Sequence, residues 1–446
     1  MNAPHPRRVL VLLAGALVAA GLVAGCASGG STTSSSTPTT AVPPASSGVV
    51  RVSQDQFTAH AEPHVAANPR DPRNLLAASM VYRGTARGLA TYASFDSGAT
   101  WQSNGPLPGA APNNDADVTV TFDQAGHGYV AGVVSTTAQL GTAYVWRTDD
   151  GGRLFQPPVA AVRGEVDHPG MAADPTAGST DLYLAGIVFE GSTSSLRFTR
   201  STDGGHSFEP SRAIDPTNGS DDRLTVVAAG PGGLVAVMYF AEPPDGSVNV
   251  MVATSTDHGS TFASHVRLST VHWPPAIPGV NPRSGPAIAI DPTTGDMYAA
   301  VATSGSDAQA SEVDVFTSHD SGRSWSPPVP AVHAVGVTYL QPQLAVDDNG
   351  RLGLEAFGLA NGRVNLILLS SSSRAATFGP LRTVTEGGGF DPTLGLANSE
   401  SASAQHWFGD YQGLTTAGGA FHPVWNDTSP GHLELFTAAI PAAPSG

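Results

Sequence analysis

Short, mainly apolar stretches follow one another along the chain, separated by turns rich in glycine and proline. Leu75–Ala78, for example, follows a turn that contains Asn68-Pro69 and Asp71-Pro72. No long run shows the period of an amphipathic helix. The 446 residues include 51 glycines and 36 prolines, which suits many short strands joined by turns. The pattern therefore predicts an all-β protein built from a repeated unit.

A turn motif of eight residues repeats along the chain and sets the length of that unit. It reads Ser/Thr-x-Asp-x-Gly-x-x-aromatic, with complete copies at 94–101, 148–155, 201–208, 255–262 and 318–325. A sixth copy at 371–378 keeps Phe378 but has Ser373 and Ala375 in place of the aspartate and the glycine. Successive copies begin 54, 53, 54, 63 and 53 residues apart, which indicates stacked supersecondary units.

The chemistry of the motif suits a tight turn between two strands. An aspartate can accept hydrogen bonds from the N–H groups of its own turn, and a glycine adopts positive φ without steric cost. The aspartates concerned are Asp96, Asp150, Asp203, Asp257 and Asp320. The motif resembles the Asp box of the sialidase (neuraminidase) superfamily. That resemblance implies a β-propeller in which the boxes are structural and lie away from the catalytic face.

Seven strand starts, each with a proline or an acidic or polar residue, alternate with the six boxes. They lie at Glu62, Asp117, His168, Asp222, Gly285, Gln341 and Asp410. The last unit, 410–440, has three predicted strands and no box after it. We expect Val49–Ser53 to supply its fourth strand and close the ring. The sequence thus predicts an all-β, sialidase-like β-propeller of seven four-stranded blades, with the family's usual six blades as the alternative.

The N-terminal segment has the features of an exported lipoprotein. Two arginines precede the apolar run Val9–Ala24, and the sequence Leu-Val-Ala-Gly before Cys26 resembles the bacterial lipobox, in which the cysteine is lipidated. Cys26 is the single cysteine, which excludes an internal disulfide. We expect a lipid anchor on the extracytoplasmic side of the bacterial membrane, with an ordinary leader as the alternative. The predicted parts are a signal peptide at 1–25, the lipidated cysteine with a disordered Ser/Thr/Pro tether at 26–47, and the propeller at 48–446.

The acidic composition narrows the range of partners. All 21 positively charged residues are arginines, against 37 carboxylates, and the net charge is −16. Such a surface argues against nucleic acid or an anionic membrane surface as a partner. The chain has no His-Glu-x-x-His motif and no Cys/His cluster, so we expect no metal cofactor. Ca²⁺ on an acidic axis is the alternative, because Ca²⁺ prefers oxygen ligands.

Candidate site residues gather on the face opposite the boxes, around the predicted axis. The candidate catalytic residues are Glu62, Asp117, Asp222, Asp410 and Tyr411. The candidate ligand-binding residues are Arg223, Trp273, Arg283, Gln341, Trp407, Trp425 and Asp427. Carboxylates converging from several blades can act as general acids and bases, and an exposed tryptophan offers an apolar plate to a sugar ring. For each polar residue the alternative is a turn residue bonded to the backbone. The two long connections, 270–284 and 383–408, belong to the same face.

The resemblance to sialidases can be tested on the residues that sialidase chemistry requires. The family uses three arginines to clamp a sugar carboxylate, the first in an Arg-Ile-Pro motif. This chain lacks that motif, and Glu62 in the matching stretch would repel a carboxylate. The arginine triad is therefore not recognisable. We expect a monomeric propeller that binds a glycan or an envelope protein without sialidase chemistry. The alternative is a glycoside hydrolase that uses the axial carboxylates, and the sequence leaves open whether the protein is an enzyme.

Overall fold

The computed structural model describes most of the chain from Gly48 onward. The described residues are 48–110, 115–135, 141–191, 193–215, 221–273, 277, 279–281, 284–305, 310–398 and 405–442. Gly48–Gly446 forms a compact unit of its own. The predicted leader, Cys26 and tether lie outside the described residues. No helix in the described part of the chain is long and apolar enough to cross a membrane.

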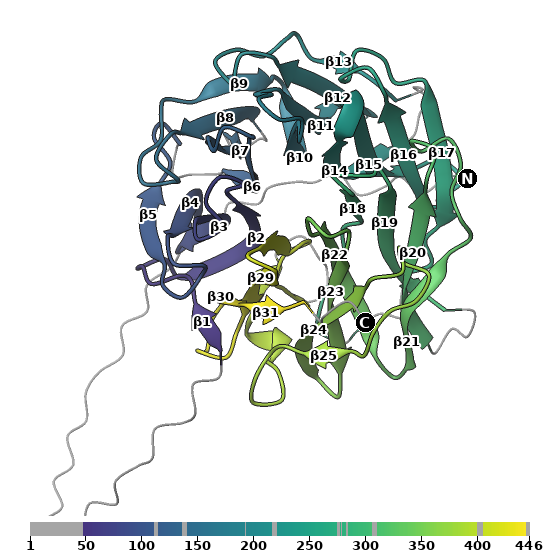
Figure 1. The fold of residues 1–446 in the computed structure, drawn as a ribbon. Coiled ribbons are helices and arrows are strands. Elements are labelled where there is room, and N and C mark those ends of the chain that lie inside the picture. The colour runs from purple at the N-terminus through teal and green to yellow at the C-terminus, as the bar shows by residue number, and fades with distance from the viewer. Residues whose placement is uncertain are drawn as a thin grey trace, which may run out of the picture. The chain divides into compact units, whose positions relative to one another are not determined.

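Seven antiparallel sheets form a ring, and in the first six blades the chain passes through the four strands from the centre outward (Figure 1). Blade 1 consists of β2 (Ala59–Ala67), β3 (Leu75–Arg83), β4 (Ala86–Ser94) and β5 (Gln102–Pro106). Blade 2 consists of β6 (Ala116–Phe122), β7 (Gly128–Val134), β8 (Thr142–Thr148) and β9 (Val159–Val162). Blade 3 consists of β10 (Glu165–Ala173), β11 (Leu182–Glu190), β12 (Thr193–Ser201) and β13 (Arg212–Ala213).

The next three blades repeat this order. Blade 4 consists of β14 (Asp221–Gly230), β15 (Leu234–Glu242), β16 (Asn249–Ser255) and β17 (Ser264–Thr270), with the short 3₁₀ helix η1 (Pro231–Gly233) between its first two strands. Blade 5 consists of β18 (Ala287–Ile290), β19 (Met297–Ser304), β20 (Ala310–Ser318) and β21 (Val329–Val335). Blade 6 consists of β22 (Thr338–Val346), β23 (Leu352–Ala360), β24 (Arg363–Ser371) and β25 (Arg382–Thr383). The connection after blade 6 contains η2 (Pro392–Leu394) and the hairpin β26–β27 (Leu396–Asn398 and Gln405–Trp407).

Blade 7 combines the two ends of the propeller. It contains β28 (Gly413–Ala417), β29 (Ala420–Asp427) and β30 (Glu434–Ala438), and β1 (Val49–Arg51) pairs antiparallel with β30. The short strand β31 (Ile440–Pro441) also pairs with β29. The prediction of seven four-stranded blades is thereby confirmed, and the six-bladed alternative is wrong.

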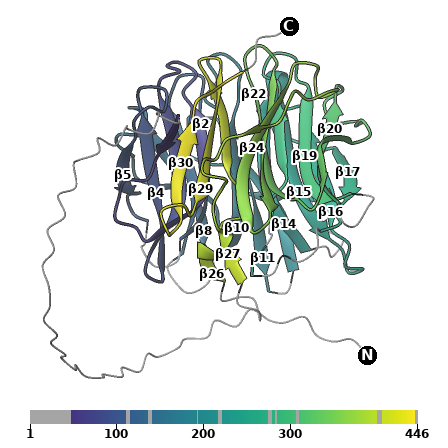
Figure 2. The ribbon, with the colours of Figure 1, turned by 90° about the horizontal axis from the view of Figure 1, so that it is seen from below.

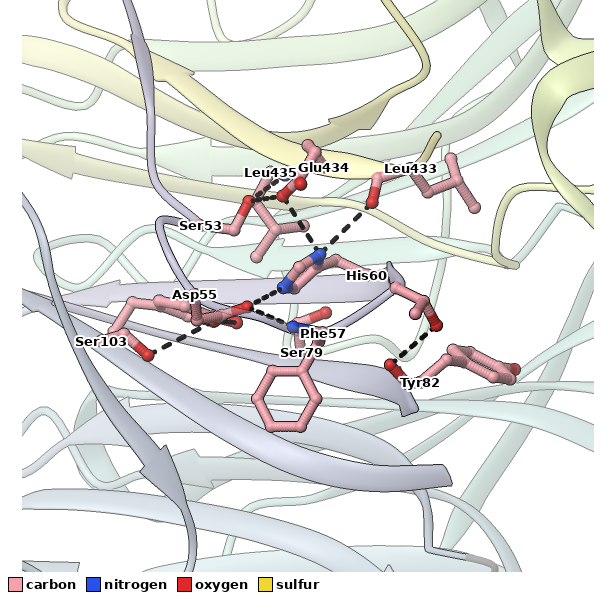
Figure 3. Close-up of polar contacts among 12 residues, drawn as sticks. Ser53, Asp55, Phe57, His60, Ser79, Tyr82, Ser103, Leu433, Glu434 and Leu435 are labelled. Atoms are coloured by element: carbon pink, nitrogen blue, oxygen red, sulfur yellow. Dashed lines mark hydrogen bonds and ion pairs between the residues drawn. The ribbon is translucent and has the colours of Figure 1, made fainter. Parts of the chain in front are cut away.

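A buried histidine links the first and last blades where the ring closes (Figure 3). His60 in β2 is fully buried, and its Nε2 lies 3.0 Å from Oδ1 of Asp55, while its Nδ1 lies 3.2 Å from Oε2 of Glu434 in β30. Arg51 in β1 and Ser53, two residues later, also donate hydrogen bonds to the Glu434 carboxylate. The junction is therefore held by charged and polar side chains as well as by strand pairing.

Apolar side chains fill the interfaces between neighbouring blades. Between blades 3 and 4, for example, Phe198 and Tyr183 pack in one cluster with Tyr239 and Val235. Because each sheet presents apolar residues on both faces, every blade is buried between two others and none of the sheets is stable alone.

The repeated box turns bond as their sequence predicts. In the copy that starts at Ser255, Oδ1 of Asp257 accepts hydrogen bonds from the Ser255 hydroxyl at 2.7 Å and from the Thr261 N–H at 2.8 Å. Gly259 has φ +71°, and a Cβ at this position would lie 2.4 Å from the Phe198 ring of the preceding blade. The glycine is thus required both by the turn and by packing between blades.

Candidate active site on the propeller axis

A repeated irregularity in the inner strands brings polar side chains to the axis. In five blades the register of the inner strand shifts at a β-bulge. The first residue within each shift has positive φ; these residues are Glu62, Asp117, His168, Leu224 and Gln341. Left-handed conformation in a residue other than glycine costs about 1–3 kcal/mol, and β-bulges redirect side chains. The strain recurs at equivalent positions around the ring, and four of the five residues are polar.

Three of these residues meet a residue of the last blade in an acidic cluster. The imidazole of His168 lies between two carboxylates, with Nδ1 3.3 Å from Oδ1 of Asp117 and Nε2 3.8 Å from Oδ2 of Asp410. The backbone N–H of His168 also donates to Oδ2 of Asp117 at 3.1 Å. Glu62 completes the cluster, because its Oε1 accepts the backbone N–H of Asp410 at 3.2 Å. We call Glu62, Asp117, Asp410 and His168 the axial cluster.

Burial and mutual repulsion favour the protonated forms of two carboxyls in the axial cluster. Burial, together with the charges of Asp117 and Asp410, raises the pKa of Glu62 well above its ordinary value. Burial also raises the pKa of Asp117 to about 6, although the neighbouring His168 acts to lower it. Carboxyls with pKa values displaced in this way are typical of acid–base sites.

Tyr411 connects the axial cluster to blade 2. Its hydroxyl accepts the Val118 N–H at 3.0 Å and lies 3.3 Å from the Val118 carbonyl oxygen, to which it donates. Burial and the charge of Glu62 raise its pKa well above the usual value, so the phenol is neutral. Its ring meets that of His168 edge-on, with centroids 6.4 Å apart. Tyr411 and His168 are half-buried, so both remain partly accessible at the axis.

The two long connections predicted for this face meet each other there. The N–H of His406 in β27 donates to the Gly279 carbonyl at 2.8 Å, and the Asn281 N–H donates to the His406 carbonyl at 2.9 Å. Figure 2 shows the hairpin β26–β27 at one face of the ring, at the lower edge in that view. Trp407 ends this hairpin, and its indole N–H donates to Oδ1 of Asp410 at 2.6 Å.

The segment after Trp407 connects several blades across the axis. The Gly285 N–H donates to the Asp410 carbonyl at 2.8 Å, and the Gln341 amide donates to the Gly409 carbonyl. The Gln412 amide donates to Oε1 of Gln341 at 2.6 Å. Residues 407–412 therefore hold blades 1, 2, 5 and 6 together as well as supplying site residues.

The structure brings together only part of the predicted site. Glu62, Asp117, Asp410, Tyr411, Gln341 and Trp407 belong to the axial cluster or touch the segment that bears it. Asp222 and Arg223 lie in blade 4 and have other partners: Arg223 forms an ion pair with Asp221. Arg283 lies outside the described residues.

The remaining predicted ligand-binding residues differ in exposure. Trp273 is 42% exposed and packs edge-on against Phe240, with ring centroids 5.7 Å apart, so it does present an apolar surface. Trp425 is fully buried and stacks on Phe436, so its prediction as an exposed plate is wrong. Asp427 bonds Ser429, which lines a pocket of about 250 Å³ beside the connection after blade 6.

Sequence reasoning missed His168 as a site residue. A signal was present, because His168 precedes a proline, as Glu62 and Gln341 do, at the equivalent point of its repeat. His168 also belongs to one of two groups that could hold a metal ion. Ligand atoms of Asp117, Asp167 and His168 lie within 4.8 Å of one another, as do those of Asp174, Asp181 and His258 on the box face.

No protein-family model matches the chain, and no curated protein matches it. Solved structures with a similar fold include Penicillium chrysogenum alpha-L-arabinanase complexed with arabinobiose, at 17% identity over 76% of this chain and 98% of that one, with a TM-score of 0.49. A Hadza microbial sialidase is 14% identical over 82% of this chain and 76% of its own, with a TM-score of 0.48. A Dyadobacter fermentans protein of unknown function is 12% identical over 88% and 97%, with a TM-score of 0.47. At such identities the likeness concerns the fold alone.

Proposed function

We propose that this seven-bladed propeller binds an uncharged glycan at its axial face. The observation that carries the proposal is the convergence of Glu62, Asp117, Asp410, His168 and Tyr411 on the axis from four different blades. Carboxylate, imidazole and phenol groups supply the donors and acceptors that sugar hydroxyls need. Trp407 lies beside them and Trp273 stands on the same face, and both offer aromatic surface to a sugar ring.

The charge of the axial cluster favours an uncharged ligand. Its carboxyls raise one another's pKa, which shows that added negative charge is unfavourable there. A sialic acid carboxylate would add to this repulsion, whereas the hydroxyl groups of a neutral sugar would not. Neutral polysaccharides are therefore the preferred ligand class.

A second candidate function is glycoside hydrolysis, and one observation favours it. A protonated Glu62 close to the charges of Asp117 and Asp410 is the pairing that a general acid and a general base or nucleophile require. In this reaction Glu62 would protonate the leaving oxygen, while Asp117 or Asp410 would activate water or attack the sugar. Tyr411 is not needed as a nucleophile, because its phenol is held neutral.

Variants of the compact unit 48–446 test the binding function. Binding of neutral and sialylated oligosaccharides would be measured by calorimetry for the wild type, Asp117→Asn and the control Asp314→Asn. Asp314 is a half-buried carboxyl in blade 5, and desolvation raises its pKa to about 6. We expect neutral-glycan binding to weaken in Asp117→Asn and to persist in Asp314→Asn. Equal binding by all three proteins would overturn the proposed location of the site.

Hydrolysis is tested separately with fluorogenic aryl glycosides. The enzymatic function would be established if the wild type hydrolyses one of these substrates and Glu62→Gln loses that turnover while it still binds glycan. Binding without turnover across the panel would leave glycan recognition as the function.

We also propose that Cys26 carries a lipid that anchors the propeller on the extracytoplasmic side of the bacterial membrane. The support is the lipobox-like sequence that ends at the single cysteine. In a bacterial host, labelled fatty acid should be incorporated into the full chain and not into Cys26→Ser. Equal labelling of both proteins would contradict the anchor.

A further inference from the structure

Two aspartates face each other at the boundary between blades 3 and 4, apart from the axial cluster. Asp215 follows β13, the outer strand of blade 3, and Asp222 lies near the start of β14, the inner strand of blade 4. The N–H of Ile214 donates to the Leu196 carbonyl at 3.0 Å, which extends the pairing of β12 with β13 and fixes the position of Asp215. The side chain of Asp222 lies within hydrogen-bonding reach of that of Asp215.

One oxygen of each of these two carboxyls lacks the kind of partner that other acidic groups nearby possess. Asp222 is 2% exposed, and its Oδ2 has no hydrogen-bond partner among the described residues. Oδ1 of Asp215 is likewise buried and without a partner in the described part of the chain. Asp221, by contrast, accepts the Ser194 hydroxyl at 2.8 Å and pairs with Arg223. An unsatisfied buried carboxyl is costly, so the arrangement calls for a missing partner.

Further potential ligand atoms come from neighbouring strands. Nδ1 of His265 in β17 and Oγ of Ser195 in β12 are also buried without a partner among the described residues. Burial lowers the pKa of His265, and the charge of Asp215 acts against that shift, so the two groups are within electrostatic reach. The carboxyls of Asp222 and Asp215 also raise the pKa of Tyr239 in addition to its burial. His265 and Tyr239 therefore lie within electrostatic reach of the pair.

Without a cation, the pair must hold a proton between its two carboxyls. Burial and the proximity of Asp215 raise the pKa of Asp222 to about 8, so a proton is retained at neutral pH. Like-charged carboxyls this close cannot both ionise unless a positive charge lies between them. A hard divalent cation would replace the shared proton and satisfy both orphaned oxygens.

We propose that Asp215 and Asp222 form a Ca²⁺ site that joins blade 3 to blade 4. The two carboxylates supply the negative charge of the site. Asp215 is only half-buried, so water can complete the coordination that Ca²⁺ requires. Binding would release the shared proton and add a further tie between blades 3 and 4, which also meet through apolar contacts and through hydrogen bonds such as that from Ser194 to Asp221.

The test is a titration of the unit 48–446 with CaCl₂ after treatment with EDTA, followed by calorimetry and by thermal unfolding. The wild type should bind Ca²⁺, and its Tm should rise with Ca²⁺ concentration. Asp222→Asn should lose this site and the Tm response that it causes. Because the amide removes the repulsion between the two carboxyls, the variant should remain folded in EDTA, with a Tm at least equal to that of the wild type.

Two controls make the result specific. Asp314→Asn removes a half-buried carboxyl whose Oδ1 is also without a partner among the described residues, but which does not share a proton with a second carboxyl. This variant should keep the wild-type response. Asp117→Asn removes a member of the axial group and should also keep the site at Asp222. The proposal is overturned if the wild type shows no Ca²⁺ binding, or if Asp222→Asn binds Ca²⁺ as the wild type does.

Discussion

The indole N–H of Trp407 donates to Oδ1 of Asp410 at 2.6 Å, which joins the long connection after blade 6 to the axial cluster. Oδ2 of the same carboxylate faces His168 at 3.8 Å, and the backbone N–H of Asp410 bonds Glu62. A single aspartate is therefore in contact with the connection, with blade 1 and with blade 3. Changes in Trp407 should reach the site through this residue.

Trp407→Phe removes the donor to Asp410 and keeps most of the aromatic surface. A hydrogen bond to a charged group contributes about 1.5–3 kcal/mol, so we expect the free energy of unfolding to fall by about 2 kcal/mol in urea denaturation. Trp273→Phe is the matched control: its side chain is 42% exposed, and the change should stay within about 0.5 kcal/mol. Equal effects of the two substitutions would contradict a structural role for the Trp407 hydrogen bond.

His60→Ala should weaken the closure of the ring. The imidazole lies between Asp55 and Glu434, and its removal leaves two poorly solvated carboxylates without the group that separates them. Losing one partner of a buried ion pair costs about 3–5 kcal/mol, and we expect a loss near the lower end at pH 7. His206→Ala, at an exposed histidine, should change little. Equal stability of the two variants by urea denaturation would show that the junction does not depend on His60.

The same contact predicts a dependence on acid. Burial acts to raise the pKa of Asp55, but the hydrogen bond and charge of His60, together with hydrogen bonds from Tyr92 and the Phe57 N–H, lower that pKa to about 2 from 3.8. A carboxyl with a lowered pKa in the folded state stabilises the protein above its unfolded value, and this stabilisation disappears as pH falls from 3.8 towards 2. Urea denaturation over this range should show a smaller loss for His60→Ala than for the wild type. Identical slopes would contradict the assignment.

Glu355 in β23 should make stability fall as pH rises above 4.5, the ordinary value of a glutamate carboxyl. The residue is fully buried, both carboxyl oxygens lack partners among the described residues, and burial raises its pKa well above the ordinary value. A raised pKa means that the folded state binds the proton more tightly, so the stabilisation is lost as pH rises through the folded-state pKa. Glu355→Gln keeps the shape without the charge. Its Tm should decline less than that of the wild type as pH rises above the ordinary carboxyl value of 4.5; parallel profiles would refute this role.

The complete and the altered box turns should differ in their contribution to stability. Asp257 accepts the Ser255 hydroxyl, the Thr261 N–H and the Thr261 hydroxyl, whereas Ser373 in the sixth copy accepts the Thr377 N–H. Both turns are exposed, so we expect losses of about 1–2 kcal/mol for Asp257→Ala and about 0.5 kcal/mol for Ser373→Ala. Chemical denaturation measures both, and a larger loss at Ser373 would contradict this interpretation.

The repeat spacing predicted the propeller because local rules determine it. The box turn requires particular residues at fixed offsets, and seven strand starts leave room for seven blades. The same periodicity brought Glu62, Asp117 and Asp410 to one axis in the prediction, since equivalent positions of a propeller lie at equivalent depths. Each of these predictions rests on information within one repeat.

The rest of the site depends on contacts between repeats. Asp222 was predicted as the equivalent of Glu62, but the left-handed residue of blade 4 is Leu224, so Asp222 lies two positions before the bulge and points elsewhere. Trp425 lies in β29, and the sequence did not show that both faces of this strand are buried. His168 shares its place before a proline with Glu62 and Gln341, but only the structure shows that it lies between carboxylates from blades 2 and 7.

The most direct test of the central claim is a glycan array probed with the labelled unit 48–446, wild type and Asp117→Asn, at neutral pH. The account predicts that the wild type binds neutral glycans in preference to sialylated ones, and that Asp117→Asn loses this binding while remaining folded. A preference for sialylated glycans, or binding that Asp117→Asn leaves unchanged, would contradict glycan recognition by the axial cluster.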